Sequence, residues 1–185
     1  MATIEEILLT AEQYGELPDP GYPTELVRGR IVRMNVPYFE HGKYCGRIDR
    51  TFGRYVDDHD LGHVLTNDSG VITERGPDTV RGPDVSFYSY SRVPKDAKVR
   101  GYPAVAPEVV FEVRSPYDRW SKLLEKVSEY LNAGVLAVYV VDPQVETVTM
   151  FDADQPGQTL HADDELTFPE PLSQFRIPIG SLFHW

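Results

Sequence analysis

The chain has little of three things: cysteine, long apolar runs and basic residues. Cys45 is the only cysteine among 185 residues, which excludes a disulfide within the chain. The first residues are acidic where a secretory signal is basic, so we expect a protein of the reducing cytoplasm. The longest apolar run, Val135 to Val141, is far below the roughly 20 residues that a helix needs to cross a bilayer. The sequence therefore predicts no membrane span.

Positive charge is scarce, because 18 Lys and Arg face 29 Asp and Glu, a formal net charge of −11. This balance argues against a protein that coats nucleic acid, since coat proteins neutralise phosphates with Lys and Arg. Local contact with nucleic acid stays open, because a basic strip can bind DNA while acids elsewhere dominate, and a bound metal partly neutralises acids around it. Basic side chains gather in two segments, which hold Arg28, Arg30 and Arg33, and Arg114, Arg119, Lys122 and Lys126.

Neither an internal repeat nor a linker divides the chain. Its length and its hydrophobic content of 41% fit one globular domain with a substantial core. We therefore expect a single domain over residues 1–185.

Apolar spacing and turn residues predict the order of the first elements. They are a helix over Ile4 to Tyr14, a loop over Leu17 to Pro23, strands on both sides of Gly29, a helix over Phe39 to Val56, and a hairpin of strands Gly62 to Asn67 and Gly70 to Glu74.

The middle of the chain predicts a strand, helix, strand unit. The strands that carry Asp84 and Glu112 come first, separated by a loop over Ser91 to Ala106. Ser115 and Pro116 fit the N-cap and first position of a helix that Gly134 ends, with Asp118 in its first turn. A buried strand from Val135 to Val141 follows, and Val145 to Phe151 pairs back on it. We expect an α/β fold with a right-handed crossover.

Two acidic residues stand out on these strands. Glu112 lies inside the apolar run Pro107 to Ser115, and Asp84 follows a Gly-Pro turn at the start of an alternating strand. A carboxylate buried among Val and Phe costs several kcal/mol unless it is paired or binds a cation. Glu112 is therefore expected to meet either a metal ion or a fixed basic partner.

The helix that follows offers a basic partner. Its apolar face includes Trp120, Leu123, Leu124, Val127, Tyr130 and Leu131. At about 100° per residue, Lys126 lies roughly 40° from the Tyr130 border of that face and can lean toward the sheet. Lys122, one turn earlier, points further out.

Six segments between Tyr14 and Phe151 carry a family resemblance. They are Glu25 to Ile31, Glu40 to Gly42, Arg81 to Val85, Glu112 to Pro116, Lys126 to Val135 and Val140 to Pro143. In this order they resemble the Uma family of restriction endonucleases, a branch of the PD-(D/E)XK nuclease superfamily.

The resemblance implies a restriction-endonuclease-like mixed central β-sheet flanked by α-helices. It also implies that Asp84 and Glu112 bind a divalent cation and that a lysine assists hydrolysis of a DNA phosphodiester. Arg114 stands two residues after Glu112, where the superfamily has Lys. Because a guanidinium stays protonated, Arg114 can hold a phosphate but cannot act as a base. The lysine role passes to Lys126, which resembles the migrated lysine of this branch.

These residue types suit the chemistry that the resemblance implies. Mg²⁺ or Mn²⁺ prefers a few carboxylate oxygens together with water and phosphate, and a nearby Lys stabilises developing negative charge. Glu25, His41 and Arg114 are expected to support the site. A nuclease that cuts both strands commonly pairs two sites by two-fold symmetry, so a homodimer is expected.

Each candidate also has a plain structural interpretation. Asp84 can cap a turn, Glu112 can pair with Arg114 or Lys126, Lys126 can be a solvated helix-edge residue, and Glu25 and His41 can be structural. The arginines around Gly29 can form a solvated strand face, and the spacing of His41 and Cys45 alone does not indicate zinc. Two other functions remain: a catalytically inactive nuclease-fold interaction module, and a metallohydrolase acting on a small phosphoester.

Overall fold

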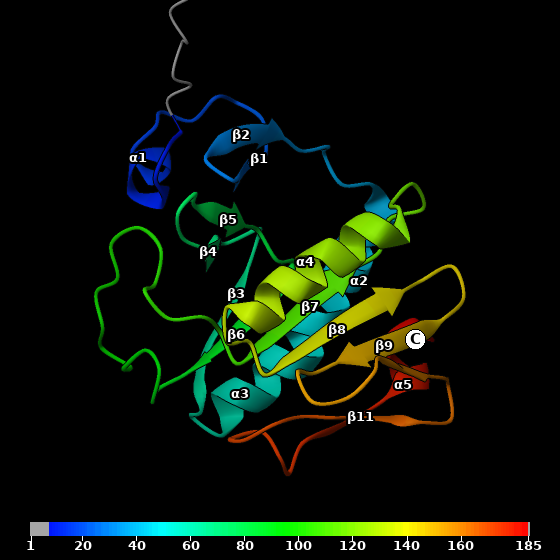
Figure 1. The fold of residues 1–185 in the computed structure, drawn as a ribbon. Helices are drawn as coiled ribbons and strands as arrows, with labels where there is room; N and C mark the ends of the chain where they lie inside the picture. The colour runs from blue at the N-terminus through cyan, green and yellow to red at the C-terminus, as the bar shows by residue number, and fades with distance from the viewer. Residues whose placement is uncertain (1–7, 185) are drawn as a thin grey trace, which may run out of the picture.

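The structure is a computed structural model that describes residues 8–184. Within this range the strands form three sheets: a central one in the order β10-β9-β8-β7-β6-β3, a smaller one in the order β2-β1-β5-β4, and the pair β11-β12. None of the helices in the described range has the length and apolar character needed to cross a bilayer. Figure 1 shows the smaller sheet beside one end of the central sheet.

The central sheet is mixed, as the sequence predicts. Its strands are β3 (Gly62–Thr66), β6 (Val85–Ser89), β7 (Val109–Val113), β8 (Ala137–Asp142), β9 (Thr147–Phe151) and β10 (Gln158–Leu160). Only β7 and β8 pair in parallel among these neighbours. The helix α4 (Trp120–Asn132) connects these two strands, and a parallel pair needs such a crossover.

Helices cover both faces of this sheet (Figure 1). The helix α4 packs on one face, where Val127 and Tyr130 join Val110 and Val138 in a buried cluster. On the other face lie α2 (Phe39–Ile48), the π-helical turn η1 (Asp49–Gly53) and α3 (Arg54–Asp58). Side chains of β7 alternate between the two clusters because successive residues of a strand point to opposite faces, so Val109, Phe111 and Val113 face α2.

The smaller sheet is built around a tight turn. Its strands are β1 (Thr24–Val27), β2 (Arg30–Arg33), β4 (Val71–Glu74) and β5 (Thr79–Arg81). Arg28 and Gly29 both have positive φ, 49° and 76°, as expected for a two-residue hairpin turn whose twist matches the strands. This confirms the strands predicted around Gly29, and it places Glu25 and Arg81 on adjacent strands.

The C-terminal elements close the face that carries α2. They are β11 (Glu165–Thr167), β12 (Arg176–Pro178) and α5 (Ile179–Phe183). The ring of Phe183 lies 5.8 Å from that of Tyr44 on α2.

The N-terminal helix is shorter than predicted. The expected helix over Ile4 to Tyr14 begins outside the described residues, and within them α1 spans only Ala11–Gly15. Thr10 and Gln13 form a capping box, in which each side chain accepts a hydrogen bond from the other residue's N–H. This reciprocal cap fixes the start of the helix at Ala11.

The predicted hairpin of residues 62–74 is wrong. β3 pairs with β6 in the central sheet, whereas β4 pairs with β5 in the smaller one. Val64 packs on the cluster beside α2, while Val71 joins the cluster beneath α4. The two strands separate because their apolar side chains belong to different cores, and Asn67 and Asp68, both with positive φ, turn the chain between them.

The predicted start of α4 is also wrong. Ser115 and Asp118 close a turn instead, since the Asp118 carboxylate accepts the Ser115 N–H at 2.8 Å and the Asp118 N–H bonds to the Ser115 carbonyl at 3.0 Å. The helix therefore begins later, at Trp120. Gly134, with φ 99°, ends it as predicted, but Leu124 on its supposed apolar face is exposed.

Candidate active site

Asp84 lies at the beginning of β6, beside the end of β7. Val85 of β6 pairs with Phe111 of β7. Two residues further along β7, the N–H of Val113 donates to Oδ2 of Asp84 at 2.6 Å. The carboxylate thus takes the place of a backbone acceptor at the end of the ladder. Its other oxygen, Oδ1, lies 3.3 Å from Nε2 of His41. Both oxygens of Asp84 are therefore held by the fold.

Glu112 lies on the face of β7 that α4 covers. Its side chain is buried, and Oε1 accepts a hydrogen bond from the Tyr130 hydroxyl at 2.8 Å. Nζ of Lys126 is 3.8 Å from the same oxygen. Burial raises the pKa of Glu112 to about 7. The positive charge of Lys126 lowers this pKa and the negative charge of Asp84 raises it, but burial has the largest effect. Asp84 thus lies close enough for its charge to act on the pKa of Glu112.

Lys126 belongs to a chain of buried charges that joins the smaller sheet to α4. Its ammonium is 2.8 Å from Oε1 of Glu25, whose Oε2 accepts from Arg81 at 2.8 Å. Arg81 also binds Glu129 through two nitrogens, at 2.5 and 2.8 Å. Such a two-point contact between Arg and a carboxylate fixes the direction of both groups.

This network keeps Lys126 positively charged. Burial alone would lower its pKa, but Glu112 and Glu25 raise it above its ordinary value. The pKa of Glu25 is lowered despite burial, because Lys126 and Arg81 both contact it. Lys126 accordingly places a positive charge beside Glu112.

His41 and Cys45 share one face of α2 with Asp84 opposite them. One ligand atom from each of these three residues lies within 4.8 Å of the others. Sγ of Cys45 is 3.4 Å from Nδ1 of His41. Burial would lower the pKa of His41, but the hydrogen bond and charge of Asp84 raise it. Burial, followed by the charge of Asp84, raises the pKa of Cys45 well above its ordinary value.

Two hollows meet at His41. One, of about 270 Å³, opens beside Asp84 and is lined also by Cys45, Asp49, Asn67 and Asp68. Asp68 was not predicted to belong to the site; burial and the charge of Asp84 raise its pKa. It follows β3 in a turn with positive φ, so only the folded path of the chain brings it to Asp84.

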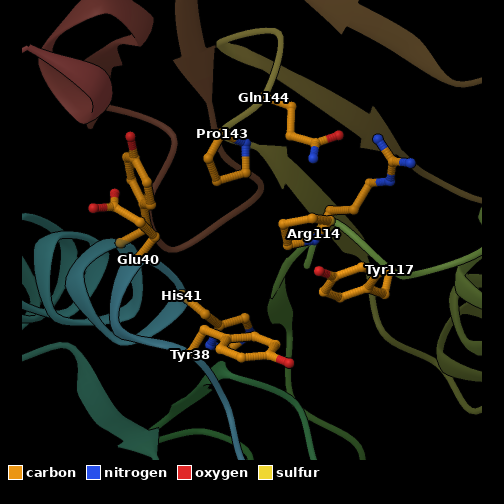
Figure 2. A pocket seen from close by; sticks show the side chains of 9 residues that line it. Tyr38, Glu40, His41, Arg114, Tyr117, Pro143 and Gln144 are labelled. Atoms are coloured by element: carbon orange, nitrogen blue, oxygen red, sulfur yellow. The ribbon is translucent and has the colours of Figure 1, made fainter.

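The second hollow, of about 350 Å³, is a groove with an aromatic rim. Figure 2 shows its lining side chains, with Tyr38 and His41 at the start of α2 and Tyr117 in the turn after β7. The rings of Tyr38 and Tyr117 are 6.0 Å apart, and both side chains are largely exposed. Flat exposed aromatic rings next to an acidic site are able to stack on nucleobases.

The structure brings most of the predicted site residues together. At the junction of β6, β7, α2 and α4, Asp84 contacts His41, and Lys126 contacts both Glu112 and Glu25. The charge of Asp84 links the two groups, because it raises the pKa of both Glu112 and Lys126. Arg114 points elsewhere: its guanidinium is 2.6 Å from Asp142 and lies 5.2 Å from the Trp120 ring. Arg28, Arg30 and Arg33 are exposed along the smaller sheet, as the solvated-face interpretation expects.

Three residues of the buried network were not predicted: Arg81, Glu129 and Tyr130. Signals for them existed, because Glu129 and Tyr130 follow Lys126 by three and four positions and so share its side of the helix. Arg81 begins the Arg-Gly-Pro-Asp segment that carries Asp84.

The donor atoms fit a hard divalent cation. Carboxylate oxygens of Asp84 and Glu112 come from adjacent strands, and a hollow beside Asp84 leaves room for water and phosphate. Mg²⁺ usually binds through one or two carboxylates and keeps several waters. The residues present could therefore hold Mg²⁺ or Mn²⁺.

This chain is similar to a solved structure and matches a family model. A solved structure described as a "putative nuclease belonging to DUF820" from Anabaena variabilis matches with a TM-score of 0.82 and 20% sequence identity, covering 96% of this chain and 98% of that one. At this identity the likeness establishes the fold. No curated protein matches the chain. A family model, Uma2, described as "Putative restriction endonuclease", matches residues 11–180. The match extends over most of the sequence and supports a nuclease-like function, and the chain belongs to the Uma2 family.

Proposed function

We propose that the protein is a divalent-metal-dependent endonuclease that hydrolyses phosphodiester bonds of DNA. Asp84 and Glu112 would hold Mg²⁺ or Mn²⁺, and Lys126 would act as a fixed positive charge. One observation carries the proposal: Asp84 and Glu112 come from adjacent strands, and the buried ammonium of Lys126 lies 3.8 Å from Glu112 and has its pKa raised by the charge of Asp84. Family membership supports the same reaction class.

Each side chain has a role that its contacts suit. Val113 and His41 orient the two oxygens of Asp84, while Tyr130 and Lys126 orient Glu112. A bound divalent ion supplies charge stabilisation and a water of lowered pKa. Because Lys126 is held charged by Glu25 and Glu112, it can stabilise negative charge that develops on the phosphoryl oxygens without moving when the reaction occurs.

The groove lined by Tyr38 and Tyr117 is the proposed path of the nucleic acid. It adjoins the Asp84 hollow through His41, which lines both. With a net charge of −11, the protein has few phosphate-neutralising residues to use over a long duplex. Stacking of bases on exposed rings contributes about 1–3 kcal/mol per base and needs no basic surface.

The alternative is a nuclease-fold interaction module without catalysis. The position of Arg114 favours it, since the side chain in the usual lysine position is bound to Asp142 and not to the carboxylates of the site. The net negative charge points the same way. The two functions differ in whether the protein binds a divalent cation and cleaves DNA.

Calorimetric titration with Mg²⁺ and Mn²⁺, followed by plasmid cleavage at saturating ion, tests the proposal. An endonuclease binds the ion and nicks or linearises the DNA. If the protein binds neither ion at millimolar concentration and cuts no form of DNA or RNA, the interaction module takes its place.

We also propose that two copies form a two-fold dimer, since cleavage of both strands commonly pairs two sites in this way. Light scattering at micromolar concentration tests this separately. A monomer mass would remove the dimer and leave the single-site chemistry intact.

A further inference from the structure

The group His41, Cys45 and Asp84 contains a sulfur atom that the proposed endonuclease chemistry does not use. His41 and Cys45 are one turn apart on α2, where residues four positions apart share a face. Asp84 approaches from the start of β6. One nitrogen, one sulfur and one oxygen atom thereby converge within 4.8 Å of one another. Two elements far apart in the sequence build this group together.

The spacing of these atoms suits a common metal ion. Zinc binds sulfur at about 2.3 Å and nitrogen or oxygen at about 2.0–2.2 Å in a tetrahedron, so ligand atoms around one ion lie a few ångströms apart. Nε2 of His41 lies 3.3 Å from Oδ1 of Asp84, whereas it is the other ring nitrogen, Nδ1, that lies 3.4 Å from Sγ of Cys45. One imidazole binds an ion through one nitrogen, and with one nitrogen counted the three ligand atoms still lie within 4.8 Å of one another, so a small movement brings them around one ion. The hollow of about 270 Å³ that adjoins all three residues gives a fourth position for water.

The donor types distinguish this group from the pair Asp84 and Glu112. Mg²⁺ takes oxygen ligands and does not favour a thiolate, whereas Zn²⁺, Cd²⁺ and Co²⁺ accept sulfur and imidazole nitrogen readily. The surroundings favour a cation, because Asp49 and Asp68 line the same hollow. The side chains of His41 and Asp84 are only 13% and 10% exposed, so bulk water does not compete freely for the ligands.

We propose that His41, Cys45 and Asp84 form a second cation site, selective for thiophilic divalent ions such as Zn²⁺. Binding replaces the thiol proton of Cys45 by the metal and releases that proton to solvent. Since Asp84 belongs to both sites, an ion bound here withdraws it from Mg²⁺ or Mn²⁺. Zn²⁺ would therefore exclude the hard ion, a regulatory effect that rests on the proposed function, whereas the site itself does not.

Co²⁺ is the direct probe of the site, because a thiolate bound to Co²⁺ gives a strong near-ultraviolet charge-transfer band. The full-length protein should show this band at one Co²⁺ per chain, and added Zn²⁺ should remove it. Cys45→Ser should abolish the band and weaken Zn²⁺ binding by at least about 10-fold, the lower end of what loss of even a supporting residue costs a metal site. Glu112→Gln should keep the band. Absence of the band in the wild-type protein, or its survival in Cys45→Ser, overturns the site.

Competition with Mn²⁺ tests the shared ligand without reference to catalysis. Electron paramagnetic resonance of bound Mn²⁺ should show its release by stoichiometric Zn²⁺ in the wild type, while Cys45→Ser should need at least about 10-fold more Zn²⁺. Retention of Mn²⁺ while Zn²⁺ occupies the site would contradict the sharing of Asp84. If the Co²⁺ band forms but no Mn²⁺ binds, the endonuclease proposal fails and the thiophilic site stands. Melting curves of both variants check that each is folded.

Discussion

Lys126 on α4 and Glu112 on β7 lie 3.8 Å apart, ammonium nitrogen to carboxylate oxygen, on the buried face of the central sheet. Glu25 holds the same ammonium from the other side at 2.8 Å. In contrast, Arg114, which follows Glu112 on the chain, contacts Asp142. A helix therefore supplies the positive charge at the carboxylates, and the strand does not.

The two carboxylates should be required for ion binding. Asp84→Asn and Glu112→Gln should each abolish calorimetric binding of Mn²⁺ and DNA cleavage, because each removes one charged ligand of the proposed ion. Glu108→Gln is the matched control. Glu108 is also a buried glutamate, but it directly precedes β7, at the end of the strand away from Glu112, and it contacts Ser89 and Arg92. Equal loss of ion binding in the control would show that damage to the fold, and not a ligand role, explains the effect.

Lys126 should affect the rate more than the binding of the ion. Lys126→Ala should keep Mn²⁺ binding and lower the cleavage rate on the order of 10²–10³-fold, because the lysine acts on charge that develops in the transition state. Single-turnover cleavage at saturating Mn²⁺ measures this. Lys122→Ala, one turn earlier and 77% exposed at its side chain, should leave the rate unchanged. A Lys126 variant with wild-type rate would remove the lysine from the proposed chemistry.

Arg81 should be important for stability. Arg81→Ala leaves Glu25 and Glu129 buried without their shared partner, and breaking a buried ion pair by removing one member costs about 3–5 kcal/mol. Urea unfolding followed by circular dichroism gives the free energy of unfolding. Arg54→Ala removes an ion pair with Asp58 in which both side chains are more than half exposed, and should cost no more than about 1 kcal/mol. Similar losses in the two variants would contradict a special role for the buried network.

Ion binding and stability should depend on pH in opposite directions. The folded pKa of Glu112, about 7, lies above its ordinary value of 4.5. A raised pKa stabilises the metal-free fold below the unfolded value, and this contribution is lost as pH rises through the folded value. His41, whose pKa is also raised, has the same sign. The metal-free protein should accordingly lose stability from Glu112 between about pH 5 and pH 7, and from His41 as pH rises above the ordinary pKa of 6.5.

A cation prefers ionised Glu112, so the increase in melting temperature caused by Mn²⁺ should grow over the same pH window. Thermal melts at several pH values, with and without Mn²⁺, measure both effects. Glu112→Gln should flatten both curves. If Mn²⁺ raised the melting temperature of the wild-type protein by the same amount at every pH, Glu112 would not be a ligand of the ion.

The sequence predicted the elements that depend on local periodicity. Alternation along β7 predicted that the side chain of Glu112 points to the other face of the sheet from those of Phe111 and Val113. The 3.6-residue period of α4 predicted that Lys126 leans toward the sheet and that Lys122 points into solvent. Both follow from geometry within one element. The family resemblance implied that the strands of Asp84 and Glu112 are neighbours, and the pairing of Val85 with Phe111 confirms it.

Other parts depend on contacts between distant segments, which no local pattern contains. β3 and β4 looked like a hairpin, yet Val64 and Val71 pack in different cores. Glu25 reaches Lys126 only because the smaller sheet lies beside α4. The start of α4 was misplaced since Asp118 bonds back to Ser115 instead of capping a helix. Cys45 and His41 are joined by Asp84 only because the fold places the start of β6 against α2, which the spacing of His41 and Cys45 does not indicate.

The account rests on a divalent ion at Asp84 and Glu112 that supports DNA cleavage. The most direct test is the cleavage of supercoiled plasmid by wild-type protein during a Mn²⁺ titration against a chelator, with Asp84→Asn in parallel. We predict nicking that rises with free Mn²⁺, stops with the chelator and is absent in the variant. Cleavage that persists in the chelator or in Asp84→Asn, or no cleavage at any Mn²⁺ concentration, would contradict the account.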